Sequence, residues 1–186
     1  MKKGVFFAIM FVAFTMAATA QNTTKTIKTN GIEMVDTMND DGTDLIKRPY
    51  RWFAGIAEAD VESVAVEMAQ LEAYAAVSRV IENVVTTKAE RSTLAVDGKV
   101  AKALKSYWEQ MSFSIQKACE PFGDTEVNYN DQTGLYEVTA KVGIRGDRYV
   151  KLLDGAKNAK PEGLDKDELQ EFLEVNDAII DSAKSD

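Results

Sequence analysis

The chain has one cysteine, Cys119, and no histidine. Histidine is the commonest general base and a frequent metal ligand, so its absence argues against most hydrolase mechanisms. Cys119 shares a predicted helical face with Met111, Ile115 and Ala118, whereas a reactive thiolate needs cationic surroundings and access to solvent. We therefore predict that Cys119 is buried and chemically quiet.

Acidic residues are plentiful, but none has the apolar sequence context that tunes a catalytic acid or base. Glu58, Asp60 and Glu62 gather at the start of a predicted helix, and Glu67 and Glu72 follow along it. Carboxylates stabilise helix N-termini, so a solvated helix face explains them better than acid–base catalysis. The sequence has no phosphate loop, nucleophile elbow or metal spacing. We predict no catalytic residue, no metal site and no cofactor.

One acidic stretch has some features of a calcium loop. Asn39, Asp41 and Gly42 fit the third, fifth and sixth positions of an EF-hand. The first and twelfth positions would then be Thr37 and Arg48, where the loop requires acidic ligands. We interpret the stretch as a solvated turn.

Two further patterns have possible binding roles. Arg145-Gly146-Asp147 spells an adhesion tripeptide, but its glycine already serves to turn the chain from a strand into a helix. Tyr50, Trp52 and Phe53 could form a stacking platform for sugar rings, although burial of Trp52 and Ala54 on one strand face is the simpler account.

The first twenty residues have the pattern of a secretory signal. Lys2-Lys3 precede an apolar run from Gly4 to Met16, and Ala18-Thr19-Ala20 forms a small-x-small site before Gln21. Cleavage there would leave 166 residues with a net charge of −10, from 20 basic and 30 acidic side chains. Such an acidic domain is a poor candidate for binding nucleic acid or anionic lipid.

We expect the mature protein to be periplasmic or secreted and free of membrane anchors. Gln21 stands where a bacterial lipoprotein would have its cysteine, and no second apolar run is long enough to span a bilayer. A single cysteine also excludes an intrachain disulfide.

Hydrophobic periodicity predicts the remaining elements. A strand covers residues 50–57, and two long helices with apolar faces cover 60–90 and 99–119. Residues 126–144 alternate as a hairpin that buries Tyr136, Val138, Ala140, Val142 and Ile144. A short helix follows at 147–156, and Asp165 with Glu168 starts a last helix.

These elements predict an α+β fold, in which a small antiparallel sheet is covered on one face by the two long helices, with an additional C-terminal helix. The predicted organisation is a signal peptide (1–20), a polar N-terminal arm (21–49), the α+β domain (50–157), and a linker with the C-terminal helix (158–186).

The order of these parts resembles the LPP-twenty-type family of small bacterial envelope lipoproteins. The resemblance rests on Gly55-Ile56-Ala57-Glu58-Ala59, on Ala73-Tyr74-Ala75-Ala76 in the long helix, and on the Tyr136-Glu137-Val138 strand. It implies a compact α+β envelope domain, without the lipidated cysteine and with no functional residue to carry over.

We therefore expect a non-enzymatic envelope protein that binds another protein or assembles with itself. The alternative is a small-ligand or glycan-binding module that uses the aromatic strand. An exposed edge strand with an apolar patch would favour the first hypothesis, and a concave pocket lined by Trp52 or Trp108 would favour the second.

Overall fold

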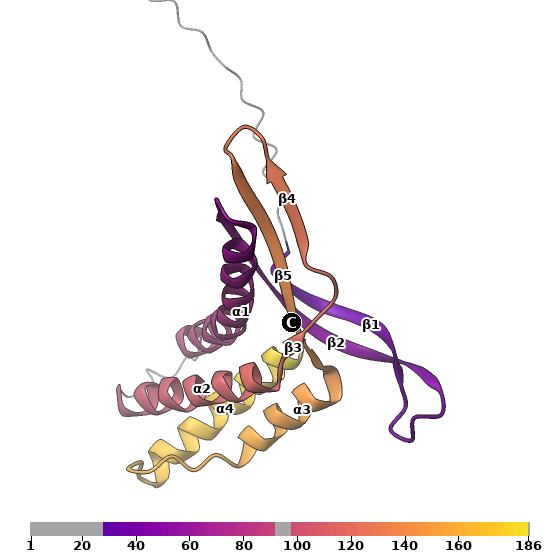
Figure 1. The fold of residues 1–186 in the computed structure, drawn as a ribbon. Coiled ribbons are helices and arrows are strands. Elements are labelled where there is room, and N and C mark those ends of the chain that lie inside the picture. Colours follow the sequence, from indigo (N-terminus) through magenta and orange to yellow (C-terminus); the bar gives the residue numbers. More distant parts are fainter. Residues whose placement is uncertain (1–27, 92–97, 186) are drawn as a thin grey trace, which may run out of the picture.

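A computed structural model describes residues 28–91 and 98–185, so the predicted signal segment and cleavage site lie outside it. The strands and helices follow one another along the chain as shown in Figure 1. Their bounds are β1 Asn30–Met38, β2 Leu45–Ala59, α1 Glu62–Arg91, α2 Gly98–Ala118, β3 Glu120–Pro121, β4 Glu126–Asn130, β5 Leu135–Arg145, α3 Gly146–Gly155, the 3-10 turn η1 Ala156–Asn158, and α4 Lys166–Ser185.

The predicted α+β class is confirmed. All strand pairings are antiparallel, and the order across the sheet is β1-β2-β5, with both β3 and β4 paired to the far side of β5. The helices gather on one side of this sheet. We call that face of the sheet the inner face and the opposite face the outer face.

The β4–β5 hairpin is folded as the alternation predicts. Val138, Ala140, Val142 and Ile144 are at most 1% exposed on the inner face, while Tyr136 is half-buried. The hairpin turns through Gly134, whose φ of 70° suits a residue without a side chain.

The alanine-rich stripe of α1 lies directly on the sheet. Ala65 and Ala69 pack with Val138 and Ala140 in one buried cluster. At Gly55 of β2 the approach is so close that an added Cβ would lie 2.2 Å from the Ala69 carbonyl oxygen. Small residues on both elements therefore allow the helix and the sheet to make backbone contact.

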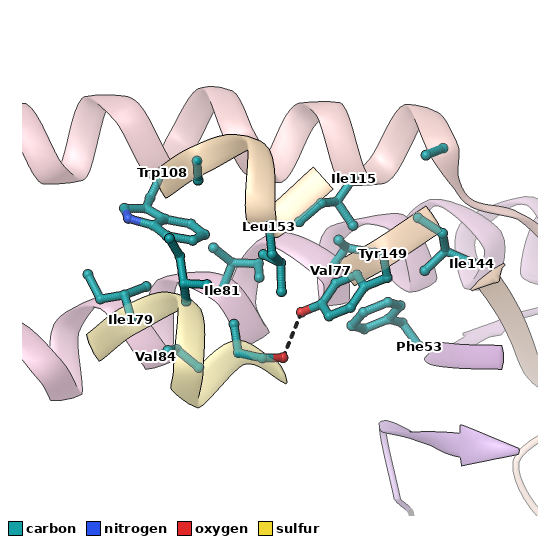
Figure 2. Packing of buried hydrophobic residues seen from close by; sticks show 14 of the residues in the cluster. Phe53, Val77, Ile81, Val84, Trp108, Ile115, Ile144, Tyr149, Leu153 and Ile179 are labelled. Atoms are coloured by element: carbon teal, nitrogen blue, oxygen red, sulfur yellow. Dashed lines mark hydrogen bonds between the residues drawn. The ribbon is translucent and has the colours of Figure 1, made fainter. Parts of the chain in front are cut away.

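The second helix, α2, packs mainly against the other helices rather than across the sheet. Its Trp108 is 2% exposed and donates a hydrogen bond from Nε1 to Oδ1 of Asn176 in α4, over 3.0 Å. The Asn176 amide in turn donates to the carbonyl of Ala156 over 2.9 Å. These bonds fix α4 relative to α2 and η1 because a buried amide left unpaired would destabilise the fold. Figure 2 shows the apolar side chains that surround Trp108.

The last helix, α4, docks on the domain. Asp165 and Glu168 form a reciprocal capping box, with bonds of 2.8 and 2.9 Å to each other's backbone N–H. At the other end of α4, the Ala183 carbonyl accepts bonds from the buried Arg51 guanidinium and from the Tyr149 hydroxyl (Figure 2).

Residues 30–49, which the sequence predicts as part of a polar N-terminal arm, form regular strands in the structure. This segment contains β1, a turn, and the first five residues of β2, which extends the predicted strand by five residues at its start. None of the side chains of residues 30–49 is buried, so the periodicity that reports burial is weak there.

The two faces of β5 give a direct test of the fold. Val138→Lys must bury a charge under α1 and should cost about 3–5 kcal/mol of unfolding free energy or prevent folding. Thr139→Lys lies on the outer face opposite Glu126 and should change stability by less than about 1 kcal/mol. Urea unfolding of both variants measures the difference, and equal losses would contradict a sheet covered on one face.

Candidate interaction surface

The β1–β2 hairpin continues beyond the body of the sheet. The pairing of β5 with β2 ends at Arg145 opposite Tyr50, so residues 45–49 of β2 pair with β1 alone. Pro49, the next residue of β2 beyond the end of this pairing, has no N–H to donate to a longer β5. Gly146, where α3 begins, also packs closely against Pro49. In Figure 1 the hairpin extends away from helices α1 and α2.

The inner face of the hairpin carries exposed apolar side chains on both sides of the charged Asp36–Lys47 pair. We call these four side chains the hairpin patch, and their exposed fractions are 56–70%; they are Ile32, Met34, Met38 and Leu45. They share one face because Met38 lies opposite Leu45 and β1 alternates with period two. Their sequence pattern does not predict this patch, since Asp36 interrupts the alternation of apolar residues along β1 and none of the four side chains is buried.

The outer edge of β1 is free among the residues that the structure describes. Ala54 donates to the carbonyl of Thr29, and Asn39 donates to that of Asp44, so the odd-numbered residues of β1 direct their backbone groups at β2. The even-numbered residues, from Asn30 to Met38, therefore direct their N–H and C=O groups outward. A free edge of this length beside an apolar patch can bind an extended polypeptide as an additional strand.

Charged groups fix the hairpin to the rest of the domain. Asp40, in the turn, lies 3.0 Å from an Arg48 nitrogen and 3.3 Å from an Arg145 nitrogen. Arg145 also contacts Asp147 over 2.6 Å. The arginine and the aspartate of the adhesion-like tripeptide are thus paired with each other, which leaves neither charge free in the way an adhesion motif requires. The hydrogen bond from Arg145 lowers the pKa of Asp147, with smaller contributions from the backbone N–H of Arg148 and from Arg48.

The calcium-loop-like segment forms the turn of the same hairpin. The Asn39 side chain accepts a hydrogen bond from the Thr43 N–H over 2.9 Å and donates one to the Thr43 hydroxyl over 3.0 Å. Gly42 takes a φ of 72°. These bonds close the solvated turn that the sequence predicts. No cluster of three or more metal-binding side chains occurs within the described parts of the chain.

The aromatic residues do not form a shared platform. Phe53 is fully buried on the inner face, while Tyr50 and Trp52 lie half-buried on the outer face. Tyr50 stacks on Phe122 at 5.5 Å, and the Trp52 ring lies against Gly31. With Trp108 in the core, neither tryptophan lines an open stacking site.

The acidic residues considered for chemistry are exposed or paired, and the cysteine is buried. Glu58, Asp60, Glu62 and Glu67 are exposed, and Glu72 is paired with Arg79 on the same helix. Cys119 is 6% exposed, and burial raises the pKa of its thiol to about 12, although the charge of Arg148 acts in the opposite direction. The predicted burial of Cys119 is confirmed, and a thiol with this pKa is protonated at neutral pH.

A second exposed apolar stripe runs along α1. Val64, Met68 and Leu71 recur at helical spacing and are 44–64% exposed, with Val61 just before the helix. Unlike β1, this helix has no free backbone groups along its length to add to the apolar contact.

Comparisons with known proteins give little further information about this surface. No protein family matches the sequence, and no similar curated protein was found. Among solved structures, the secreted protein HP1454 from the human pathogen Helicobacter pylori is similar at 15% identity over 73% of this chain, with a TM-score of 0.28. The alignment covers 53% of that protein, so this chain spans about half its length. Within the described residues, no helix is both long enough and apolar enough to cross a membrane.

Because Cys119 is buried, we predict that its thiol reacts slowly. The native protein should react with a bulky thiol reagent at neutral pH far more slowly than the urea-unfolded chain, because the thiol is both covered and protonated. Cys119→Ala should keep the fold and lose no more than about 1–2 kcal/mol. Stopped-flow labelling measures the two rates, and comparable rates would contradict the burial.

Proposed function

We propose that this protein is an exported, non-catalytic binding domain that captures an extended polypeptide on its β1–β2 hairpin. The free edge of β1, beside the exposed hairpin patch, carries this proposal. Export is supported by the basic, apolar and small-residue pattern of residues 1–20. Membership of the LPP-twenty-type family remains a prediction.

Two properties of the hairpin support polypeptide binding. Its outward backbone groups would gain partners from an added strand, which gives affinity without requiring a particular sequence. The hairpin patch would then select apolar side chains on alternate positions of that strand. Patches of this kind mark interaction sites because water solvates apolar surface poorly.

The glycan-binding alternative has less support. A sugar-binding platform needs an aromatic ring with an open face. The Trp52 ring lies against Gly31 and has the Lys141 ammonium 5.3 Å from its centre, while Trp108 is enclosed in the helical core. No reaction is assigned, since the one thiol is buried and the acidic residues singled out in the sequence are solvated or paired.

Site-specific photo-crosslinking in the producing bacterium tests the proposal. A benzophenone amino acid replaces Leu45, which is 70% exposed in the hairpin patch, or Phe113, which is 60% exposed on α2 and serves as the matched control. We expect polypeptide adducts at position 45 and few at position 113. Mass spectrometry of the envelope fraction identifies the adducts and also checks whether the mature chain begins at Gln21.

Absence of any polypeptide adduct at position 45, or equal adducts at both positions, would contradict the proposed binding surface. An adduct with a glycan would instead support the alternative function.

A further inference from the structure

We infer that the strand bound at the free edge is β1 of a second copy of this chain, paired antiparallel about a two-fold axis at Val35. This inference rests on the proposed function, because it uses the same edge and names its occupant. It follows from the register that the backbone allows and from the charges that β1 carries.

Backbone direction restricts the possible registers. Only the even-numbered residues of β1 direct their N–H and C=O groups at the free edge, as the bonds from Ala54 to Thr29 and from Asn39 to Asp44 establish. In an antiparallel pair, residues opposite each other are either both hydrogen-bonded or both not. Even residues must therefore lie opposite even residues, and the axis of a symmetric pair must pass through a residue rather than between two.

Charge removes two of the four central registers. An axis at Glu33 would place Glu33 opposite Glu33 of the partner subunit, and an axis at Asp36 would do the same for Asp36. Like charges directly opposite each other destabilise a strand pair. Registers centred on Met34 and on Val35 remain.

Side-chain matching favours the axis at Val35. That register places Ile32 opposite Met38 of the partner subunit, and Val35 opposite Val35 of the partner subunit. Its one kind of apolar–carboxylate contact is Met34 opposite Asp36 of the partner subunit. Glu33 then faces Thr37 of the partner subunit, so the carboxylate meets a hydroxyl. The register centred on Met34 would place Ile32 opposite Asp36 of the partner subunit and Glu33 opposite Val35 of the partner subunit, an apolar side chain against a carboxylate in each case.

The remaining acidic side chain of β1 has compensation within its own subunit. Asp36 lies opposite Lys47 on β2, on the same face of the hairpin. An opposite-charge cross-strand pair reduces the repulsion that two acidic chains would otherwise meet at this edge.

The shape of the domain is compatible with this pairing. A two-fold axis perpendicular to the sheet keeps the helices of both copies on one face, and the hairpin extends past α1 and α2 before it reaches the axis (Figure 1). The two hairpin patches would then join across the axis, and Ile32 and Met38 would each gain an apolar neighbour.

Four substitutions separate edge pairing from other contacts. Met34→Pro removes an N–H that points outward and leaves the β1–β2 bonds in place, so it should convert a dimer into a monomer. Phe113→Lys places a charge on an exposed site of α2, outside the hairpin, and should leave the dimer intact. Val35→Cys should form an intersubunit disulfide, because opposed residues at a non-hydrogen-bonded position have Cα atoms about 4.5 Å apart. Met34→Cys is its control.

Sedimentation equilibrium of the exported protein and non-reducing electrophoresis give the readouts. We expect a dimeric mass for the wild type and Phe113→Lys, half that mass for Met34→Pro with unchanged circular dichroism, and a disulfide at position 35 in preference to 34. A monomeric wild type, or a dimer that Met34→Pro leaves intact, would overturn self-pairing. A disulfide at 34 in preference to 35 would overturn the register.

The two proposals fail separately. If crosslinking at Leu45 captures a different protein while the wild type sediments as a monomer, self-pairing is wrong and the proposed function holds. If position 45 gives no polypeptide adduct and the wild type is a monomer, both are wrong.

Discussion

The contact between α1 and the sheet at Gly55 sets the arrangement of the other elements. The backbone of α1 passes so close to β2 that a Cβ on Gly55 would lie 2.2 Å from both the Ala69 oxygen and the Ala73 nitrogen. Only a glycine facing an alanine stripe permits this distance. Because protein interiors are close-packed, the position of α1 on the sheet determines where the other helices can pack against it.

The position of α1 also explains why the β1–β2 hairpin is left uncovered. With α1 over residues 54–59 of β2 and α3 and α4 against the segment near Arg51, the helical layer ends at Pro49, against which Gly146 of α3 packs. The Trp108–Asn176–Ala156 bonds hold α4 within that layer, and the hairpin patch stays 56–70% exposed. The proposed binding surface is thus exposed because the helices cover only part of the sheet.

Elements that bury a face could be predicted from the sequence, and those that bury little could not. The alternation through Val138 and Val142 and the stripe containing Trp108 follow from burial with periods of 2 and about 3.6 residues. β1 contributes mainly exposed side chains and backbone bonds, which leave only a weak trace in residue type. The position of α2 beside α4 depends on the buried Asn176, a long-range contact that periodicity does not encode. The hairpin patch could not be predicted for the same reason, because its side chains are exposed and burial imposes no pattern on them.

Denaturation of two glycine variants tests the central constraint most directly. Gly55→Ala adds a methyl against helix backbone that cannot move aside, so we expect a loss of about 3 kcal/mol or more. Gly155→Ala is the matched control, since its Cβ would meet open space and its backbone is helical, with φ −59° and ψ −29°. It should be neutral or stabilise by roughly 0.5–1 kcal/mol. If Gly55→Ala unfolds at the same urea concentration as Gly155→Ala, α1 does not rest on β2 at this distance and the account is wrong.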